Sequence, residues 1–191
     1  PSSAVGRTVI SLAAANGLHL HALDVSQAFI QSSWADLPEQ VDTIYVRPPD
    51  GVDEEDGVVY EVLRPLYGIP SSARALHFSL ARWFRDEGFH PAGFEESVFI
   101  RKKGGKYKAD VIVSTHIDDL LCACADLPTL DMFKQRFFAS FDGTDDGEAE
   151  DYLGCEVLRD WSKGTITVRQ KGYIQRVLRA CGAQHYEPRR T

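Results

Sequence analysis

Two adjacent carboxylates interrupt an apolar run near the middle of the chain. In VIVSTHIDDLLCAC, residues 111–124, Asp118 and Asp119 stand among apolar and small neutral residues and one histidine. Burying an unpaired carboxylate costs several kcal/mol, so such groups either lie at an exposed turn, where Asp is common, or bind a cation. A third carboxylate, Asp24, lies near the end of another apolar segment, LHLHALDV. These residues leave two interpretations open, a tight turn or a metal site.

The elements that would position these carboxylates follow from the spacing of apolar, glycine and proline residues. Helices are expected over residues 4–16, 72–87, 129–141 and 172–181. Strands are expected over residues 18–25, 43–51, 58–63, 152–158 and 165–168, with a hairpin over residues 97–115 that leads into the aspartate pair. Reduced to its core, the predicted order is strand, helix, strand, tight turn, strand, helix, strand.

This order predicts an α+β fold, a ferredoxin-like β-α-β-β-α-β unit with inserted hairpins and a short C-terminal strand–helix extension. In such a unit the first and third core strands are neighbours at the centre of the sheet. Asp24 would then face Asp118, although the two residues are 118 − 24 = 94 positions apart. The expected meeting of distant carboxylates favours the metal site over the turn.

Carboxylates gathered in this way suit magnesium and phosphoryl transfer. Mg²⁺ takes near-octahedral oxygen ligands and usually keeps waters and substrate phosphates beside one or two carboxylates. Two such ions, about 3.5–4 Å apart, activate an attacking oxygen and stabilise a leaving one. Neighbouring strand residues face opposite ways, so we expect Asp24 and Asp118 as the main ligands and Asp119 as a weaker third.

Composition bounds the class of protein. The chain has 191 residues, is 43% hydrophobic and carries a net charge of −7, which argues against a free-standing nucleic-acid binder. Charge is uneven, because residues 142–151 hold six acids and no base while residues 101–108 hold five bases and no acid. We expect a solvated loop and a basic hairpin, respectively. No apolar run approaches the ~20 residues of a membrane span, no signal peptide is expected, and the cysteines form no C-x-x-C pair for zinc.

Six segments, in this order, resemble the reverse transcriptase of copia-type retrotransposons. They are LDVSQAFI, IYVRPPDGV, LRPLYGIPSSARA, HIDD, YLGCEV and RQKGYIQRVL, and together they extend over nearly the whole chain. Each is weak alone, and their order and spacing make the resemblance specific. It implies a polymerase palm over residues 1–160, with fingers elements at about 40–70, and the start of a thumb or connection region over residues 161–191.

The resemblance also implies roles for individual residues. Asp24, Asp118 and Asp119 match the catalytic aspartates, with Mg²⁺ as cofactor and Mn²⁺ as a substitute. Phe29 matches the aromatic residue that excludes a 2′-hydroxyl and so favours deoxynucleotides. The nucleotide-binding set implied by the resemblance is Val25, Ala28, Phe29, Ser71 and Arg74, and the primer-contact set is His116, Ile117, Leu153 and Gly154.

The chain departs from the family pattern near both sets. His116 stands where the family has a tyrosine, and Pro70 and Ser71 stand where it has lysine and glutamine. A histidine adds a titratable group beside the expected metals. The family also has a basic fingers segment before the equivalent of Val5 and an RNase H domain after the polymerase, so we expect the chain alone to have little activity.

The leading interpretation is an RNA-directed DNA polymerase that transfers a nucleotide from a deoxynucleoside triphosphate to a primer 3′-hydroxyl. The alternative is a catalytically inactive or domesticated relative that serves as a binding or assembly module. A nucleotide cyclase would hold its aspartates closer in sequence, and an RNA-binding module would carry interleaved aromatic residues on its central strands. Expected partners are a primed RNA or DNA template and the rest of a polyprotein (fingers, RNase H, integrase), with no membrane. The expected location is a cytoplasmic virus-like particle, with nuclear delivery.

Overall fold

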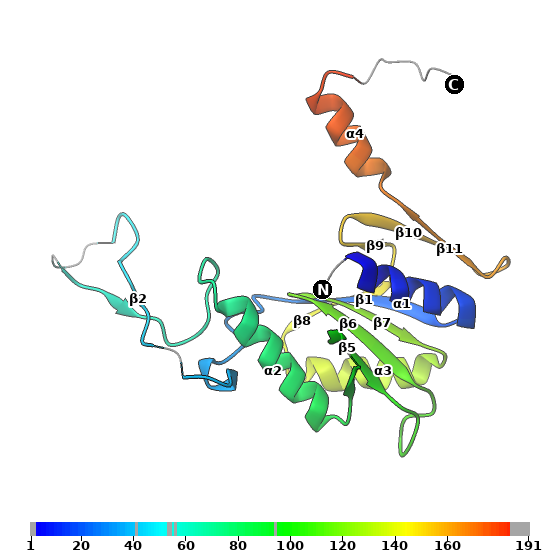
Figure 1. Ribbon diagram of the computed structural model, residues 1–191, viewed down its shortest axis with the longest axis horizontal. Coiled ribbons are helices and arrows are strands. Elements are labelled where there is room, and N and C mark those ends of the chain that lie inside the picture. Colours follow the sequence, from blue (N-terminus) through cyan, green and yellow to red (C-terminus); the bar gives the residue numbers. More distant parts are fainter. Residues whose placement is uncertain (1–2, 41, 53–54, 56, 94, 184–191) are drawn as a thin grey trace.

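The protein is described here by a computed structural model that covers residues 3–40, 42–52, 55, 57–93 and 95–183 (Figure 1). The expected domain ends at residues 1–2 and 184–191 lie outside the described residues. The helices are α1 (Ser3–Asn16), the short 3₁₀ helix η1 (Trp34–Asp36), α2 (Ser72–Asp86), α3 (Leu127–Phe138) and α4 (Lys171–Ala180). The strands are β1 (His19–Val25), β2 (Tyr45–Val46), β3 (Tyr60–Glu61), β4 (His90–Ala92), β5 (Glu95–Arg101), β6 (Val111–His116), β7 (Asp119–Cys124), β8 (Gly143–Glu148), β9 (Asp151–Tyr152), β10 (Cys155–Asp160) and β11 (Thr165–Arg169).

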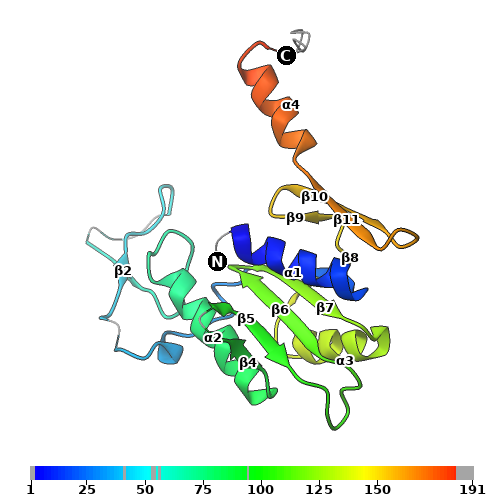
Figure 2. The same cartoon turned by 45° about the vertical axis from the view of Figure 1, so that its right-hand side comes forward.

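A six-stranded antiparallel sheet forms the centre of the molecule, in the order β4-β5-β6-β7-β1-β8. Helix α1 lies on one face of this sheet, and α2 and α3 lie on the other (Figure 1, Figure 2). The strand that ends near Asp24 is β1, and the strand that follows the aspartate turn is β7. Their expected pairing is present.

Each face of the sheet buries its own core, because side chains alternate along a strand. On the face of α2 and α3, Leu23 and Val25 of β1 join a cluster rich in phenylalanine. In this cluster the rings of Phe84 and Phe99 stack with their centroids 4.4 Å apart. On the α1 face, Leu20 and Ala22 of β1 pack with residues of α1 and with Tyr152. Asp24 has the parity of Leu20, so it belongs to the α1 face, at the end of the strand.

Helix ends follow local signals in the sequence. Gly17, with a φ of 60°, ends α1 in the left-handed conformation that glycine adopts without strain. Helix α3 begins at Leu127, two residues before the expected start at residue 129. The reason is Asp126, whose carboxylate accepts a hydrogen bond from the Thr129 backbone N–H at 2.9 Å and so caps the helix.

Two expectations about the C-terminal third are wrong. Residues 142–151 were expected as a loop, yet β8 forms there and pairs with β1 as the edge of the main sheet. A charged edge strand keeps its carboxylates in water and resists pairing with other chains. Residues 152–158 were expected as one strand of the core. They divide between β9 and β10 because Leu153 and Gly154 both take positive φ, at 50° and 74°, and turn the chain.

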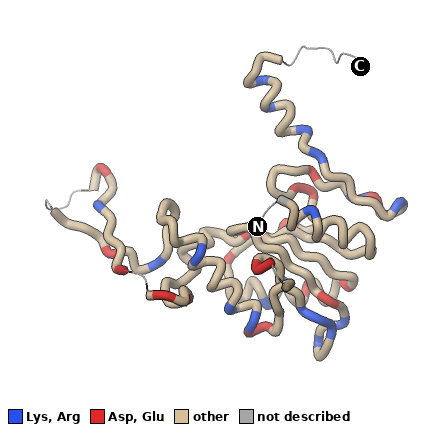
Figure 3. The backbone as a smooth tube through the Cα atoms, in the orientation of Figure 1, with Lys and Arg blue, Asp and Glu red and all other residues tan. Residues whose placement is uncertain are grey.

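The strands β9, β10 and β11 form a separate three-stranded sheet, from which α4 projects away from the main sheet (Figure 1). Helix α4 has no buried residue and no acidic one, and lysine and arginine follow it along its length (Figure 3). On the other side of the molecule, β2 and β3 form a hairpin that extends away from α2 (Figure 1). None of the helices in the described ranges is long and apolar enough to cross a membrane.

Candidate active site

Three carboxylates meet at one end of the β1–β7 pair. Asp24 and Asp119 are directly opposite each other in the antiparallel register. Asp118 lies in the turn that joins β6 to β7, and its carbonyl oxygen accepts a hydrogen bond from the Val25 backbone N–H at 2.9 Å. The turn is tight because Ile117 takes a φ of 58°, which is uncommon for a β-branched residue. Aspartates distant in sequence are therefore held side by side by backbone pairing.

The negative charges of these aspartates repel one another. Burial and then the negative charge of Asp118 raise the pKa of Asp24 above its ordinary value. Burial, the charge of Asp118 and the charge of Asp24 raise the pKa of Asp119, in that order of size. A cation bound here would relieve this repulsion, since it favours the charged form of each carboxylate. The folded chain thus holds these groups at an electrostatic cost.

Oxygen donors of this kind fit Mg²⁺, which binds one or two carboxylates and completes its shell with waters and phosphates. Among the residues that the structure describes, no group of three or more His, Cys, Asp or Glu side chains is arranged so that it could hold a metal ion by itself. Binding of Mg²⁺ here would therefore need oxygen ligands beyond these carboxylates.

A fourth carboxylate, Asp146, belongs to this neighbourhood and was missed by the sequence analysis. The pairing of β8 with β1 shifts register, so that Ala22 lies opposite Gly147 and Leu23 opposite Asp145, with Asp146 left unpaired between them. Its charge also raises the pKa of Asp24. The sequence signal was the glycine after two aspartates, since a glycine inside a strand often marks a bulge.

The start of β8 holds the backbone of Asp24 from one side. Gly143 lies opposite Val25, and a Cβ on Gly143 would stand only 2.2 Å from the carbonyl oxygen of Asp24. The preceding residue, Asp142, accepts a hydrogen bond from the Ser26 backbone N–H at 3.0 Å. Gln31 reinforces this contact, because its side-chain amide donates to the Asp142 carbonyl at 2.8 Å and accepts from the Asp142 N–H at 2.7 Å.

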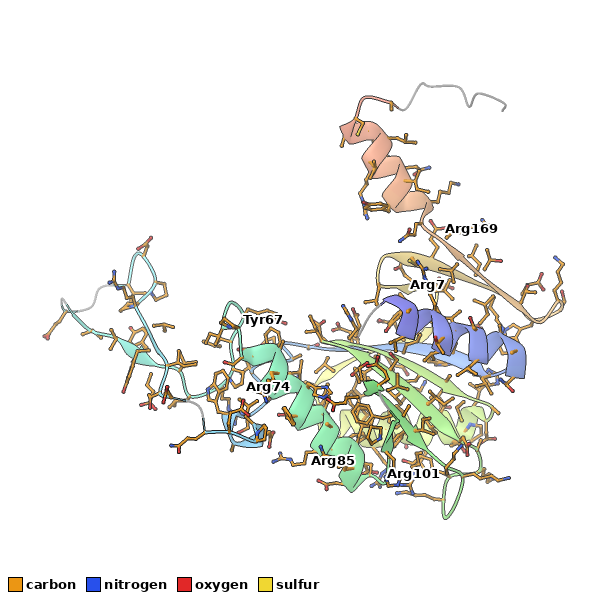
Figure 4. All side chains as sticks on the ribbon, in the orientation of Figure 1. Arg7, Tyr67, Arg74, Arg85, Arg101 and Arg169 are labelled. Carbon is orange, nitrogen blue, oxygen red and sulfur yellow. The ribbon has the colours of Figure 1, made fainter. Side chains whose placement is uncertain are left out.

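The residues of the expected nucleotide-binding set have different surroundings. Val25 and Ala28 are fully buried in the core, so they can shape the loop after β1 by packing but cannot touch a ligand directly. Phe29 is 8% exposed. Ser71 is the residue before the first turn of α2. Arg74, labelled in Figure 4, forms an ion pair with Glu39 and is therefore occupied in the absence of substrate.

The four expected primer-contact residues lie on two turns. His116 and Ile117 lie at the β6–β7 turn, and Leu153 and Gly154 form the β9–β10 turn. Ile117 and Leu153 both expose large apolar side chains. The Nδ1 atom of His116 is buried without a hydrogen-bond partner in the described part of the chain. The backbone of His116 lies opposite Asp119, so the imidazole belongs to the margin of the carboxylate site.

Comparisons with known proteins identify the family of the chain. The family model described as reverse transcriptase (RNA-dependent DNA polymerase) matches residues 3–190. The Pol polyprotein of the transposon TNT 1-94 from Nicotiana tabacum is 26% identical over 95% of this chain and 13% of its own length. That of the transposon RE1 from Arabidopsis thaliana is 28% identical over 80% of this chain and 10% of its own length. No solved structure shows a significant match.

The chain belongs to the reverse transcriptase family. Its resemblance to the copia-type reverse transcriptases of retrotransposons is confirmed by the family match and by these transposon relatives. The family is one of nucleotidyl-transferring polymerases. The chain spans about a tenth of the length of the polyproteins that it matches.

Proposed function

We propose that this chain is the palm of an RNA-directed DNA polymerase, in which Asp24, Asp118 and Asp119 hold two Mg²⁺ ions for nucleotidyl transfer. The observation that carries the proposal is the register of β1 and β7, which sets Asp24 opposite Asp119 with Asp118 in the adjoining turn. These three positions are also the ones that match the family's catalytic motif.

The strand order supports a ferredoxin-like palm. Within the six-stranded sheet, the four core strands in chain order are β1, β6, β7 and β8. They lie side by side in the order β6-β7-β1-β8, so that the fourth core strand is beside the first and the third is between the first and the second. Helices α2 and α3, which connect these strands, lie on the face away from α1. We assign residues 1–160 to the palm, with fingers elements at about 40–70, and residues 161–191 to the start of the thumb or connection region.

The reaction joins the primer 3′-oxygen to the α-phosphorus of a deoxynucleoside triphosphate, and pyrophosphate leaves. When bound, Mg²⁺ or Mn²⁺ neutralises the phosphate charge and lowers the pKa of the attacking hydroxyl. The protein's own part is alignment: backbone pairing fixes the carboxylates, and the hydrogen bonds of Gln31 fix the loop that carries Phe29. Phe29 blocks a 2′-hydroxyl, and Arg74 leaves Glu39 to bind a phosphate. His116, Ile117, Leu153 and Gly154 contact the primer end.

The expected partners are a primed RNA or DNA template, deoxynucleoside triphosphates and the rest of a Pol polyprotein that includes fingers, RNase H and integrase segments. The expected location is a cytoplasmic virus-like particle, followed by delivery to the nucleus. The alternative, an inactive binding module, is motivated by the departures at His116 and Ser71, whereas the carboxylates held together at an electrostatic cost favour the polymerase.

Primer extension tests the proposal. The chain, and a longer Pol chain that contains it, are given an RNA template, a DNA primer, deoxynucleotides and Mg²⁺. Extension is expected from the longer Pol chain, with little from the chain alone, and Asp118→Asn is expected to abolish it. The matched control is Asp86→Asn, which removes an exposed carboxylate of α2 and should leave extension unchanged. Absence of extension by both the chain and the longer Pol chain, or full activity of Asp118→Asn, would refute the proposal.

A further inference from the structure

Tyr67 is an exposed aromatic residue in contact with the expected sugar-discriminating residue. Its ring centroid lies 4.4 Å from that of Phe29, with the ring planes inclined at 55°. Tyr67 is nevertheless 60% exposed, whereas Phe29 is 8% exposed. One part of the tyrosine ring thus packs on Phe29 while the rest faces solvent, beside the N-terminal end of α2 (Figure 4).

The segment that carries Tyr67 is docked onto the loop after β1 by contacts between residues far apart in the sequence. The Trp34 indole N–H donates to the carbonyl oxygen of Val62 at 3.1 Å. The Arg64 guanidinium donates to the carbonyl oxygen of Ile30 at 3.1 Å. These two bonds join residues 62–64, shortly before Tyr67, to residues 30–34, directly after Phe29. The position of Tyr67 over Phe29 is therefore fixed by the backbone of both segments.

The chain on the other side of Tyr67 is also fixed. The backbone N–H of Leu66 donates to the hydroxyl of Ser72 at 3.1 Å, and Ser72 is completely buried in the first turn of α2. Phe29 is held in turn by Ser32, whose hydroxyl donates to the Phe29 carbonyl at 2.6 Å. Both rings consequently project from anchored backbone, which is what a shape-selective wall requires.

We propose that Tyr67 is a second specificity-determining residue of the nucleotide site. It acts through Phe29, because its ring packs on Phe29 and supports that ring in the position that blocks a 2′-hydroxyl. This inference rests on the proposed polymerase function. A single buried phenylalanine backed by solvent would yield to a larger sugar, whereas a ring supported by a second anchored ring resists displacement.

The test is the preference for deoxynucleotides over ribonucleotides, measured as the ratio of kcat/KM values in single-nucleotide extension. Tyr67→Ala is expected to lower this ratio about three- to tenfold, the factor that loss of one aromatic pair supplies. Tyr67→Phe keeps the ring and should keep the ratio. Tyr45→Ala is the matched control, since Tyr45 is 59% exposed in the β2–β3 hairpin and, within the part of the chain that the structure describes, makes no ring contact with Phe29.

A double variant separates support of Phe29 from a general effect on folding. If Tyr67 acts through Phe29, the variant with both Phe29→Leu and Tyr67→Ala should discriminate no worse than Phe29→Leu alone. Independent effects that multiply would overturn the inference. So would an unchanged ratio in Tyr67→Ala, or a loss in Tyr67→Phe as large as that in Tyr67→Ala.

Equilibrium binding gives a readout that does not depend on chemistry. Imido analogues of dATP and ATP, which resist transfer, are titrated into the chain with primer–template and Mg²⁺. The same three- to tenfold loss of preference is expected in Tyr67→Ala. A wild-type chain that binds both analogues equally overturns the inference whether or not it extends primers. Failure of extension by both the chain and the longer Pol chain, with an intact binding preference, would instead overturn the polymerase proposal and leave the role of Tyr67 standing.

Discussion

Replacing Gly143 by alanine should displace the backbone of the first aspartate. The added Cβ would stand 2.2 Å from the carbonyl oxygen of Asp24, 2.9 Å from a ring carbon of Phe138 and 3.2 Å from the carbonyl carbon of Asp24. A carbon and a carbonyl oxygen ordinarily approach no closer than about 3.3 Å, so β1 and β8 must separate by roughly 1 Å. The Phe138 ring can rotate away, whereas the Asp24 carbonyl belongs to a paired strand and cannot move alone.

Two effects of known size follow from that displacement. Overpacking of this kind costs about 1–3 kcal/mol of unfolding free energy. A shift of about 1 Å in a catalytic group costs about 10²-fold in rate. We therefore expect Gly143→Ala to lose about 1–3 kcal/mol in urea denaturation and about a hundredfold in kcat/KM for single-nucleotide extension, while remaining folded.

The matched control for this prediction is Gly17→Ala. Gly17 has a positive φ, of 60°, which Gly143 does not, but nothing lies within 4 Å of the position of an added Cβ, and Gly17 precedes the opposite end of β1. Alanine there costs about 1–2 kcal/mol of backbone strain and should leave the extension rate unchanged. Wild-type kcat/KM in Gly143→Ala, or an equal loss of rate in the two variants, would refute the argument that Gly143 positions Asp24.

Three further changes have expected signs. Asp119→Asn should stabilise the chain at pH 7, because the raised pKa of Asp119 means that its charged form is unfavourable in the folded state. The increase in unfolding temperature over the wild type should shrink as the pH falls towards about 3.9, below which the carboxyl is protonated in both states. Lys134→Met should lower the free energy of unfolding, measured in urea, by about 2–3 kcal/mol, because it removes the ammonium that lies 2.9 Å from the Asp145 carboxylate. This loss is smaller than that of a fully buried pair, since Asp145 is partly exposed. Glu87→Gln should cost about 1.5–3 kcal/mol by the same assay, since the two-point pairing with Arg136 holds the pKa of Glu87 low.

Each of these predictions has an outcome that contradicts it. Destabilisation by Asp119→Asn at neutral pH would mean that the carboxylates do not repel one another in the folded chain. Lys134→Arg keeps the charge and should recover most of the stability lost in Lys134→Met; equal losses would point to packing. The cost of Glu87→Gln should vanish as the pH falls through the lowered pKa of Glu87, and a cost that persists in acid would contradict an ionic origin.

Much of the site's framework could be predicted because its signals are local. Alternation along residues 18–25 fixed the face of Asp24, and the aspartate turn followed from two polar residues between apolar runs. The pairing of β1 with β7 needed one further step, the assumption of a split β-α-β order. Helix α2 could be placed because Pro70 and Gly88 bracket an apolar stripe.

Other features depend on contacts that no local pattern carries. The acids of residues 142–151 favour a loop, and only the free edge of β1 makes a strand there favourable. The unpaired position of Asp146 follows from a shift in that pairing. The ion pair of Arg74 with Glu39 and the contact of Tyr67 with Phe29 each depend on how the loop after β1 meets the segment before α2.

A change of metal preference tests the central claim most directly. Asp118→Cys replaces a hard oxygen ligand by a thiolate, which prefers softer metals. If Asp118 binds a catalytic metal, this variant should lose primer extension in Mg²⁺ and regain part of it when Cd²⁺ or Mn²⁺ is added. Asp118→Ser, of similar size but without a thiolate, should regain none. Wild-type extension by Asp118→Cys in Mg²⁺, or equal behaviour of the two variants in every metal, would contradict a metal-binding role for Asp118.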